Sequence, residues 1–291
     1  MGENSFDNIG IDSTYSKAIK FSQSHYENFP VASLFLPKNI RKHVAVVYNF
    51  ARNADDIADE GEYSIKERIQ HLEKYRYQFS EALQGNYANE FWKALHNTII
   101  SFNLSEKYFF DLLSAFGQDI TKHRYETFIE LLDYCKRSAN PVGRIILEFF
   151  DIIRHDKAIE YSDAICTALQ LTNFLQDVSV DYKKGRIYLP ITEIKKYGVN
   201  ESSFLEKRND ANFKNLLTFQ VNRSSELFEK GKNLLPLLPK RLRFQISLTI
   251  LGGEEILRKI RKIDYDVLNI RPKLSKIDYV KLLAKAFIKN D

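Results

Sequence analysis

Two short acidic clusters in this chain each place hard oxygen ligands four residues apart. The first runs from Asp55 to Asp59 in the order Asp-Asp-Ile-Ala-Asp, and the second contains Asn173, Asp177 and Asp181. Because four residues of an α-helix turn about 400° and rise about 6 Å, ligands at this spacing share one helix face. Carboxylate and amide oxygens are ligands that Mg²⁺ prefers. The clusters therefore predict a divalent metal site, in which two helix faces could confront each other across a cavity.

The first cluster alone is a weak signal, because an acidic run is most often a solvated helix face. It falls in the last turns of a predicted helix, where the negative end of the helix dipole makes carboxylates unfavourable without a compensating cation. The second cluster is stronger, since its ligands lie among Leu171, Phe174 and Val178. We expect that helix to have little soluble surface. A buried carboxylate needs a partner, and Mg²⁺ completed by substrate phosphates would supply it.

Basic residues beside both clusters could hold those phosphates. Arg52 lies one turn before the first cluster, and Lys183, Lys184 and Arg186 follow the second. Guanidinium and ammonium groups pair with phosphate oxygens, although each of these side chains taken alone is more often solvated. A diphosphate is therefore the predicted remaining ligand.

Helices must position these groups, and the apolar spacing along the chain is mostly helical, which predicts an all-α bundle. We expect the first cluster at the end of a helix over 38–60, closed by Gly61, and the second on a helix over 162–180. Further helices are predicted at 64–83, 88–102, 105–122, 212–232, 240–261 and 276–289.

Two breaks in the helical pattern lie near the candidate site. Pro141 interrupts a helical pattern over 127–150, because proline removes a backbone hydrogen bond and bends the axis. The break could aim backbone groups into a cavity. The segment from Lys183 to Pro190 must also leave helical geometry, and we expect it to form a loop at the cavity mouth.

The composition suits one globular domain over residues 1–291, with 44% apolar residues and no linker rich in Gly, Ser or Pro. The net charge of +5 is spread among 38 acidic residues, so no nucleic-acid partner is expected. Two cysteines, Cys135 and Cys166, and a polar N-terminus favour a cytoplasmic protein.

Membrane contact, if any, is expected to be transient and peripheral, at the inner face of the membrane. No stretch approaches the roughly 20 apolar residues that span a bilayer. The segment Lys281–Lys289 pairs an apolar stripe with a basic face, which could touch anionic lipid, although a packed terminal helix is the commoner role.

The residues around both clusters resemble the squalene and phytoene synthase family, whose members join isoprenoid diphosphates head to head. Tyr48–Asp59 resembles the first aspartate-rich motif and Gln170–Asp181 the second, and the similarity continues through Arg186–Pro190 and spans most of the chain. The resemblance implies an isoprenoid synthase bundle around a central cavity with two facing acidic helices. It also implies Mg²⁺ as cofactor, held by Asp55, Asp59, Asn173 and Asp177, with Asp181 close by.

The resemblance also implies which residues meet the prenyl diphosphate substrate. Contacts are expected from Tyr48, Arg52, Gln170, Arg186, Tyr188 and Tyr265. Arg52 would assist ionisation as a fixed cation. Tyr134 matches a family tyrosine near the reacting carbons, and a core tyrosine with a satisfied hydroxyl is the alternative.

Within the family, three stretches resemble the bacterial hydroxysqualene synthases of hopanoid biosynthesis: Glu27–Ser33, Ser138–Arg144 and Cys166–Asn173. Such enzymes are implied to take presqualene diphosphate, eject its diphosphate with Mg²⁺ help, and let water capture the rearranged cation as hydroxysqualene. NADPH would not be consumed. Other enzymes of squalene and hopanoid synthesis are then possible partners.

Three departures from the wider family bear on the reaction. Many members carry Ser-x-Ser-Phe where this chain has Tyr26–Phe29, Arg where Gln176 stands, and Gly where Asn140 stands. These losses suit an enzyme that performs only the later half-reaction. The amide of Asn140 could orient the attacking water, a role that Gly could not perform.

Three alternatives remain. The nearest is a synthase that condenses two farnesyl or geranylgeranyl diphosphates to presqualene diphosphate, squalene or phytoene. A helical di-iron carboxylate oxidoreductase would normally need paired Glu-x-x-His motifs, which the sequence lacks. A non-catalytic prenyl-lipid binding protein would not require metal-triggered ionisation, so the acidic clusters argue against it.

Overall fold

The computed structural model describes residues 4–24 and 36–290. The stretches Tyr26–Phe29 and Glu27–Ser33 lie outside the described residues. Within the described ranges every regular element is a helix, and the one β-bridge is an isolated pair between Arg124 and Ile187. The predicted all-α class is confirmed. No described helix is both long enough and apolar enough to cross a membrane.

The chain groups into two compact units, which are described separately. The first unit extends to Thr121 and also takes in Arg144–Ile153, and the second unit comprises Lys122–Gly143 and the chain from Arg154 onward. The assignment of one domain to the whole chain stays a prediction.

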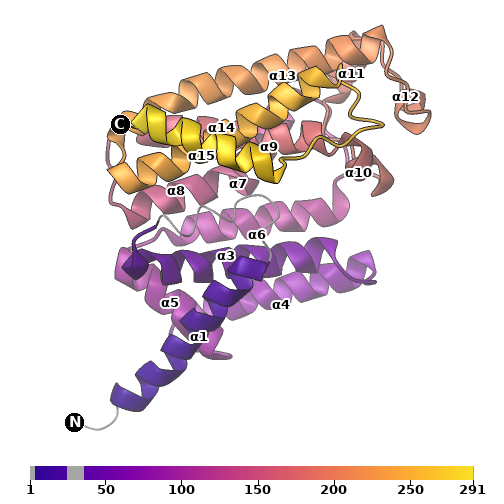
Figure 1. Cartoon of the computed structure of the whole chain (residues 1–291). Coiled ribbons are helices and arrows are strands. Elements are labelled where there is room, and N and C mark those ends of the chain that lie inside the picture. The colour runs from indigo at the N-terminus through magenta and orange to yellow at the C-terminus, as the bar shows by residue number, and fades with distance from the viewer. Residues whose placement is uncertain (1–3, 25–35, 291) are drawn as a thin grey trace. The chain divides into compact units, whose positions relative to one another are not determined.

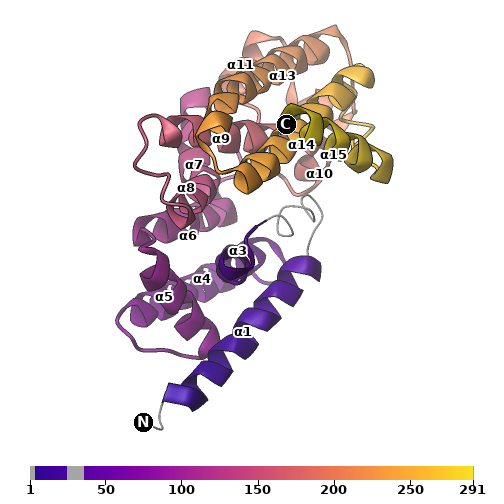
Figure 2. The ribbon, with the colours of Figure 1, turned by 60° about the vertical axis from the view of Figure 1, so that its left-hand side comes forward.

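The first unit is built around one central helix, α3, which packs against all four of the other helices that lie wholly within the unit. These elements are α1 (Asn4–Ser24), α3 (Lys38–Asp59), α4 (Ile65–Leu83), α5 (Glu90–Phe102) and α6 (Glu106–Thr121) (Figure 1). Figure 2 views α3 nearly along its axis, with α1 on one side and α4 and α5 on the other. Phe50 on α3 is fully buried against the rings of Phe79, Trp92 and Phe109.

The second unit is centred on α9, which packs against α7, α13, α14 and η1. Its elements are α7 (Phe128–Ser138), the start of α8 (Asn140–Phe149), α9 (Ala158–Gln176), α10 (Val178–Lys183), α11 (Ile191–Lys196), α12 (Glu201–Leu205), α13 (Ala211–Gly231), η1 (Lys232–Leu237), α14 (Lys240–Lys262) and α15 (Lys276–Asn290). Glycine permits close approach of α14 and α13, since a Cβ at Gly253 would lie 2.4 Å from Phe228 Cζ.

Most predicted helices are confirmed to within two residues at each end. The pattern over 127–150 breaks between α7 and α8, next to Pro141, as expected. The predicted helix over 162–180 needs correction, because α9 begins at Ala158 and ends at Gln176, and α10 follows as a separate turn. Three described α-helices and the 3₁₀ helix η1 were not predicted. The elements α11, α12 and η1 are too short to show periodicity, and polar residues mask the pattern of α1.

Candidate active site

The first acidic cluster lies on the last two turns of α3, where Arg52 holds two of its carboxylates. Arg52 Nη2 is 2.7 Å from Asp56 Oδ1, and Nη1 is 3.5 Å from Asp55 Oδ2. Partial burial works against the charged guanidinium, but the carboxylates of Asp56 and Asp55 outweigh it and raise the pKa of Arg52 above its ordinary value. Arg52 therefore supplies a compensating cation for the cluster, and its contact with a diphosphate stays a prediction.

Four predicted site residues share one face of α3. At 100° per residue, Tyr48, Arg52, Asp55 and Asp59 fall within an arc of roughly 60°, and all four are partly exposed. The opposite face is buried in the core of the first unit through Val46, Phe50, Ala54 and Ala58. Helix periodicity therefore brings these four groups to one surface.

A second cation compensates the carboxylates at the end of α3. Arg68, on α4, donates from Nη1 to the carbonyl oxygens of Ile57 (3.1 Å) and Glu60 (2.9 Å) and from Nη2 to that of Gly61 (2.7 Å). The carbonyls of Ile57 and Glu60 are among those that a helix end leaves without partners, and the carbonyl of Gly61 follows them. A positive group there opposes the helix dipole. Arg68 was not predicted, because only the packing of α4 on α3 places it there.

The second cluster spans a break between two helices. Asp177 (φ −106°, ψ 12°) caps the end of α9, and α10 carries Asp181. Backbone bonds still join the ligands at one-turn spacing, from Asp177 N to Asn173 O (2.9 Å) and from Asp181 N to Asp177 O (2.8 Å). Asn173 is exposed and Gln170, Asp177 and Asp181 are partly exposed. Eleven of the 19 residues of α9 are buried, so the expectation that this helix has little soluble surface is confirmed.

Arg271 forms a bidentate ion pair with Asp177. Its Nε donates to Asp177 Oδ1 and its Nη2 donates to Oδ2 at 3.0 Å. Arg271 lies in the connection between α14 and α15, 94 residues along the chain from Asp177. From the sequence, Arg271-Pro272 indicated only a break between two helices. No local pattern could have predicted that Arg271 contacts the second cluster.

Gln176 anchors the same connection. Its side chain is buried, and Nε2 donates to the carbonyl oxygen of Pro272 at 2.7 Å. The Gln176 amide therefore fixes the segment that carries Arg271.

The chain leaves helical geometry from Lys184 to Pro190, one residue later than predicted because Lys183 still belongs to α10. This loop runs beside residues 123–126. Ile187 N donates to His123 O at 3.0 Å, and Arg186 N donates to Asp181 O at 2.8 Å. Arg186 and Tyr188 are partly exposed, whereas Lys183 and Lys184 are fully exposed. The location of this loop at a cavity mouth stays a prediction.

Tyr134 and Tyr188 meet in one aromatic cluster of the second unit. Tyr188 stacks on Phe174 with ring centroids 3.9 Å apart and planes 4° apart. Tyr134 lies 6.2 Å from Phe174 and 6.1 Å from Tyr188, and Tyr125 completes the group. Tyr134 is buried, so its ring is part of the core as well as a neighbour of the second cluster's helix.

Asn140 is buried at the start of α8 and is held by α9. Thr167 Oγ1 donates to Asn140 Oδ1 at 3.0 Å. The two helices approach closely beside this bond, because a Cβ at Gly143 would lie 2.4 Å from Ser162 Oγ and 2.6 Å from Cys166 Sγ. Thr167 was not singled out from the sequence, although it stands inside the stretch Cys166–Asn173.

Tyr265 lies in the turn after α14, in the left-handed region at φ 61°. Its backbone N donates to Ile260 O at 3.0 Å and its carbonyl accepts from Val267 N at 2.8 Å. Its substrate contact stays a prediction.

Within the described ranges, no group of three or more His, Cys, Asp or Glu side chains is assembled for a metal ion. The predicted oxygen ligands are instead carboxylates and one amide, spaced along helices. Such a set fits Mg²⁺, which is usually held by one or two carboxylates and completed by waters and substrate phosphates.

The chain resembles several known proteins over most of its length. It is 40% identical to a hydroxysqualene synthase of Zymomonas mobilis over 56% of this chain, although it spans only 54%, about half, of that relative. A hydroxysqualene synthase of Rhodopseudomonas palustris is 30% identical over 92% of this chain and 90% of its own length. A phytoene synthase of Arthrospira platensis is 25% identical over 89% of this chain and 87% of its own length.

A solved structure agrees with the fold. The crystal structure of squalene synthase HpnC from Alicyclobacillus acidocaldarius matches with a TM-score of 0.82 and 36% identity, over 88% of this chain and 96% of that one. The model of the squalene/phytoene synthase family matches residues 22–278. This chain belongs to the squalene/phytoene synthase family, with its all-α isoprenoid synthase fold.

Proposed function

We propose that this chain is a hydroxysqualene synthase, which converts presqualene diphosphate and water to hydroxysqualene and diphosphate within squalene and hopanoid biosynthesis. The family acts on prenyl diphosphates. The observation that carries the proposal is the higher identity to hydroxysqualene synthases, 40% and 30%, than to phytoene synthases, at 25%. The buried Asn140, bonded to Thr167, supports a role for that amide in water capture.

The chain's own groups would prepare the departing diphosphate. Asp55 and Asp59 on α3, and Asn173, Asp177 and Asp181 in the second unit, would hold Mg²⁺ through oxygen ligands. When bound, the ion supplies Lewis-acid stabilisation of the negative charge on the leaving group. Arg52, kept protonated by its carboxylate neighbours, would donate hydrogen bonds to diphosphate oxygens.

The bond that breaks is the carbon–oxygen bond to the diphosphate, whose electron pair leaves with the diphosphate. The cyclopropylcarbinyl cation left behind must be shielded from indiscriminate quenching. The rings of Tyr134, Phe174 and Tyr188 would supply an aromatic wall, because ring faces attract positive charge at close range.

Asn140 would orient one water toward the rearranged cation. Thr167 donates to Oδ1 of the amide, so the Nδ2 hydrogens are left to hold the water oxygen. The water oxygen forms the new carbon–oxygen bond, and the proton it loses goes to solvent. No reductant enters this balance, so NADPH is not expected.

The direct test gives the purified chain presqualene diphosphate and Mg²⁺ without NADPH. Hydroxysqualene, identified by mass spectrometry, is the expected product, and chelation of Mg²⁺ should stop its formation. A parallel incubation with farnesyl diphosphate alone is the control. Its conversion to presqualene diphosphate or squalene would favour the alternative head-to-head synthase, which the phytoene synthase relatives support.

We also propose a transient peripheral contact with a cytoplasmic membrane face. Substrate and product are long hydrocarbons that partition into lipid, so a synthase that touches the bilayer shortens their transfer through water.

A further inference from the structure

Helix α15 carries apolar side chains on its outward face. Ile277 and Val280 are each 67% exposed, Phe287 is 56% exposed and Ile288 is 79% exposed. At 100° per residue these four positions fall within an arc of roughly 100°. Large apolar residues exposed singly are ordinary, but four on one helix face form a continuous stripe, each member of which stays more than half exposed.

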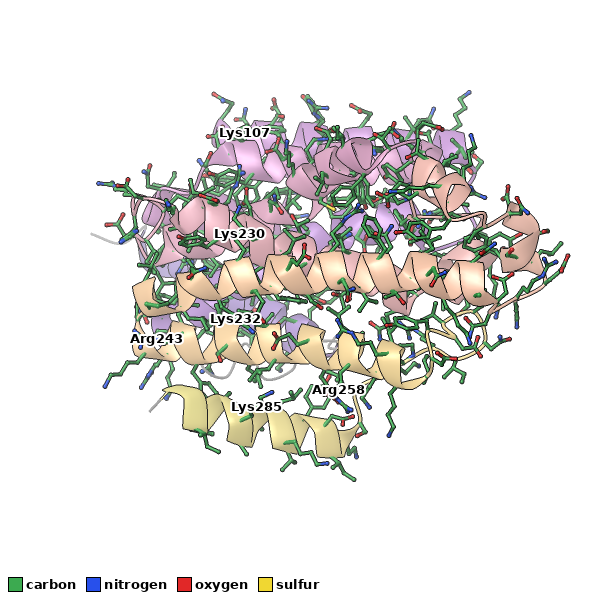
Figure 3. All side chains as sticks on the ribbon, turned by 90° about the horizontal axis from the view of Figure 1, so that it is seen from above. Lys107, Lys230, Lys232, Arg243, Arg258 and Lys285 are labelled. Carbon is green, nitrogen blue, oxygen red and sulfur yellow. The ribbon has the colours of Figure 1, made fainter. Side chains whose placement is uncertain are left out.

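The packing of α15 uses the opposite face. Leu282 and Ala286 are buried, and the helix packs against α14, beside which it lies in Figure 3. Phe287 is oriented by Phe244 on α14, with ring centroids 4.6 Å apart. The sequence predicted one apolar stripe and one basic face over 281–289. The structure instead gives α15 a second apolar face, which α14 leaves open.

Positive charge surrounds this outward face. Lys276, Lys281 and Lys285 are exposed on α15, and Figure 3 labels Lys285 there. The one carboxylate of the helix, Asp278, is turned toward α14, where its Oδ2 lies 2.7 Å from Lys259 Nζ and its side chain is 14% exposed. Among the described side chains of α15, the exposed charged ones are therefore all positive.

We propose that the outward face of α15, formed by Ile277, Val280, Phe287 and Ile288 with Lys276, Lys281 and Lys285, docks onto an anionic lipid bilayer. Amphipathic helices with basic flanks lie in the headgroup plane and bury their apolar stripe beneath it. Each lysine near an anionic surface adds attraction. A stable protein interface uses about 20–30 residues a side, far more than this narrow stripe offers.

This proposal names the surface for the membrane contact proposed above. It rests on that proposed contact and not on the proposed reaction. The experiment is co-sedimentation of the full chain with vesicles, either phosphatidylcholine alone or phosphatidylcholine with phosphatidylglycerol, in the absence of any prenyl diphosphate. We expect binding to the anionic vesicles that weakens with salt. Because no substrate is added, the result is the same whichever prenyl diphosphate the chain uses.

Two double variants and their matched controls locate the surface. Ile277→Ser with Ile288→Ser, and separately Lys281→Glu with Lys285→Glu, should each weaken binding at least tenfold. The apolar control is Ile129→Ser with Leu205→Ser, which are 80% and 72% exposed elsewhere in the second unit. The charge control is Lys17→Glu with Lys66→Glu, both exposed on the first unit. Both controls should leave binding within twofold of the wild type, allowing for the change in net charge.

Three results would overturn the assignment. They are failure of the wild type to bind anionic vesicles, binding by the α15 variants equal to that of the wild type, and conversion of a wild-type dimer to monomer by Ile277→Ser with Ile288→Ser in light scattering. The last result would assign the face to a second copy of the chain. Circular dichroism of each variant verifies that the fold is retained.

Discussion

Thr167 donates its hydroxyl hydrogen to Asn140 across 3.0 Å, and the residues are 6% and 3% exposed. The bond joins α9 to the first residue of α8, immediately before Pro141. An amide whose oxygen is already engaged presents its two N–H donors in a fixed direction. The pair thus couples the acidic helix of the second unit to the residue proposed to orient water.

Removal of the hydroxyl should change the product more than the rate. In Thr167→Val the Asn140 amide loses its restraint, so we expect diphosphate release within about threefold of the wild type but a smaller fraction of alcohol among the products. Asn140→Gly should have the larger effect. Mass spectrometry of the products, with a separate diphosphate assay, measures both quantities.

Thr167→Ser supplies the control, because serine keeps the hydroxyl and should restore the wild-type product ratio. Equal product ratios in Thr167→Val, Asn140→Gly and the wild type would remove both residues from water capture.

Substitution of Arg271 should alter Mg²⁺ binding even without substrate. The guanidinium now occupies both oxygens of Asp177, and a metal ion must displace it to use that carboxylate. In Arg271→Gln we therefore expect Mg²⁺ to bind severalfold more tightly in titration calorimetry. Arg137→Gln is the matched control, since Arg137 Nη2 lies 2.9 Å from Oδ2 of Asp133, a carboxylate that does not belong to the cluster. Unchanged or weaker Mg²⁺ affinity in Arg271→Gln would contradict this competition.

Loss of a predicted metal ligand should abolish ionisation. Asp59→Asn and Asp177→Asn each remove a charge from the proposed Mg²⁺ ligands, and we expect diphosphate release to fall at least about 100-fold. The control is Asp133→Asn, whose side chain is 62% exposed in an i,i+4 pair with Arg137. Near-normal turnover in either ligand variant would exclude that carboxylate from the reaction.

The two acidic clusters differ in how far their structure could be predicted from the sequence. Tyr48, Arg52, Asp55 and Asp59 lie on one uninterrupted helix, so 3.6-residue periodicity was enough to place them on one face. The helix break at Asp177 could not be predicted from a local signal, because no Pro or Gly lies beside it. Its surroundings depend on Arg271 and Pro272, which are distant in sequence and reach α9 only through tertiary packing.

Gly143→Ala should destabilise the second unit. The added methyl would lie 2.4 Å from Ser162 Oγ and 2.6 Å from Cys166 Sγ, so α8 and α9 must separate or Ser162 must change rotamer. Overpacking of this kind costs about 1–3 kcal/mol. Gly117→Ala in α6 is the control, because among the described residues its methyl would meet only Leu72 Cδ2, at 3.5 Å, and should stabilise by about 0.5–1 kcal/mol. Chemical unfolding of both variants measures the difference, and equal midpoints would refute the clash.

Acid should destabilise the first unit through His43. Burial, followed by the charge of Lys42, lowers the pKa of His43 to about 4 from an ordinary value of 6.5. His43 Nδ1 lies 2.8 Å from Thr98 Oγ1, which also meets Tyr15 OH at 3.0 Å, so the ring joins α3 to α5 and α1. Protonation would bring an uncompensated charge into this contact.

The sign follows from proton binding in the two states. Between pH 6.5 and 4 the unfolded chain binds a proton at His43 that the folded chain does not, so the free energy of unfolding falls as pH falls through this window. It is independent of His43 above the window, and the loss by pH 4 is at most about 3 kcal/mol. Urea unfolding of the wild type and His43→Gln from pH 4.5 to 7.5 isolates the effect, because the other titrating groups are common to both. The wild type should show the steeper dependence on pH, and parallel curves would show that His43 is protonated in the folded state without cost.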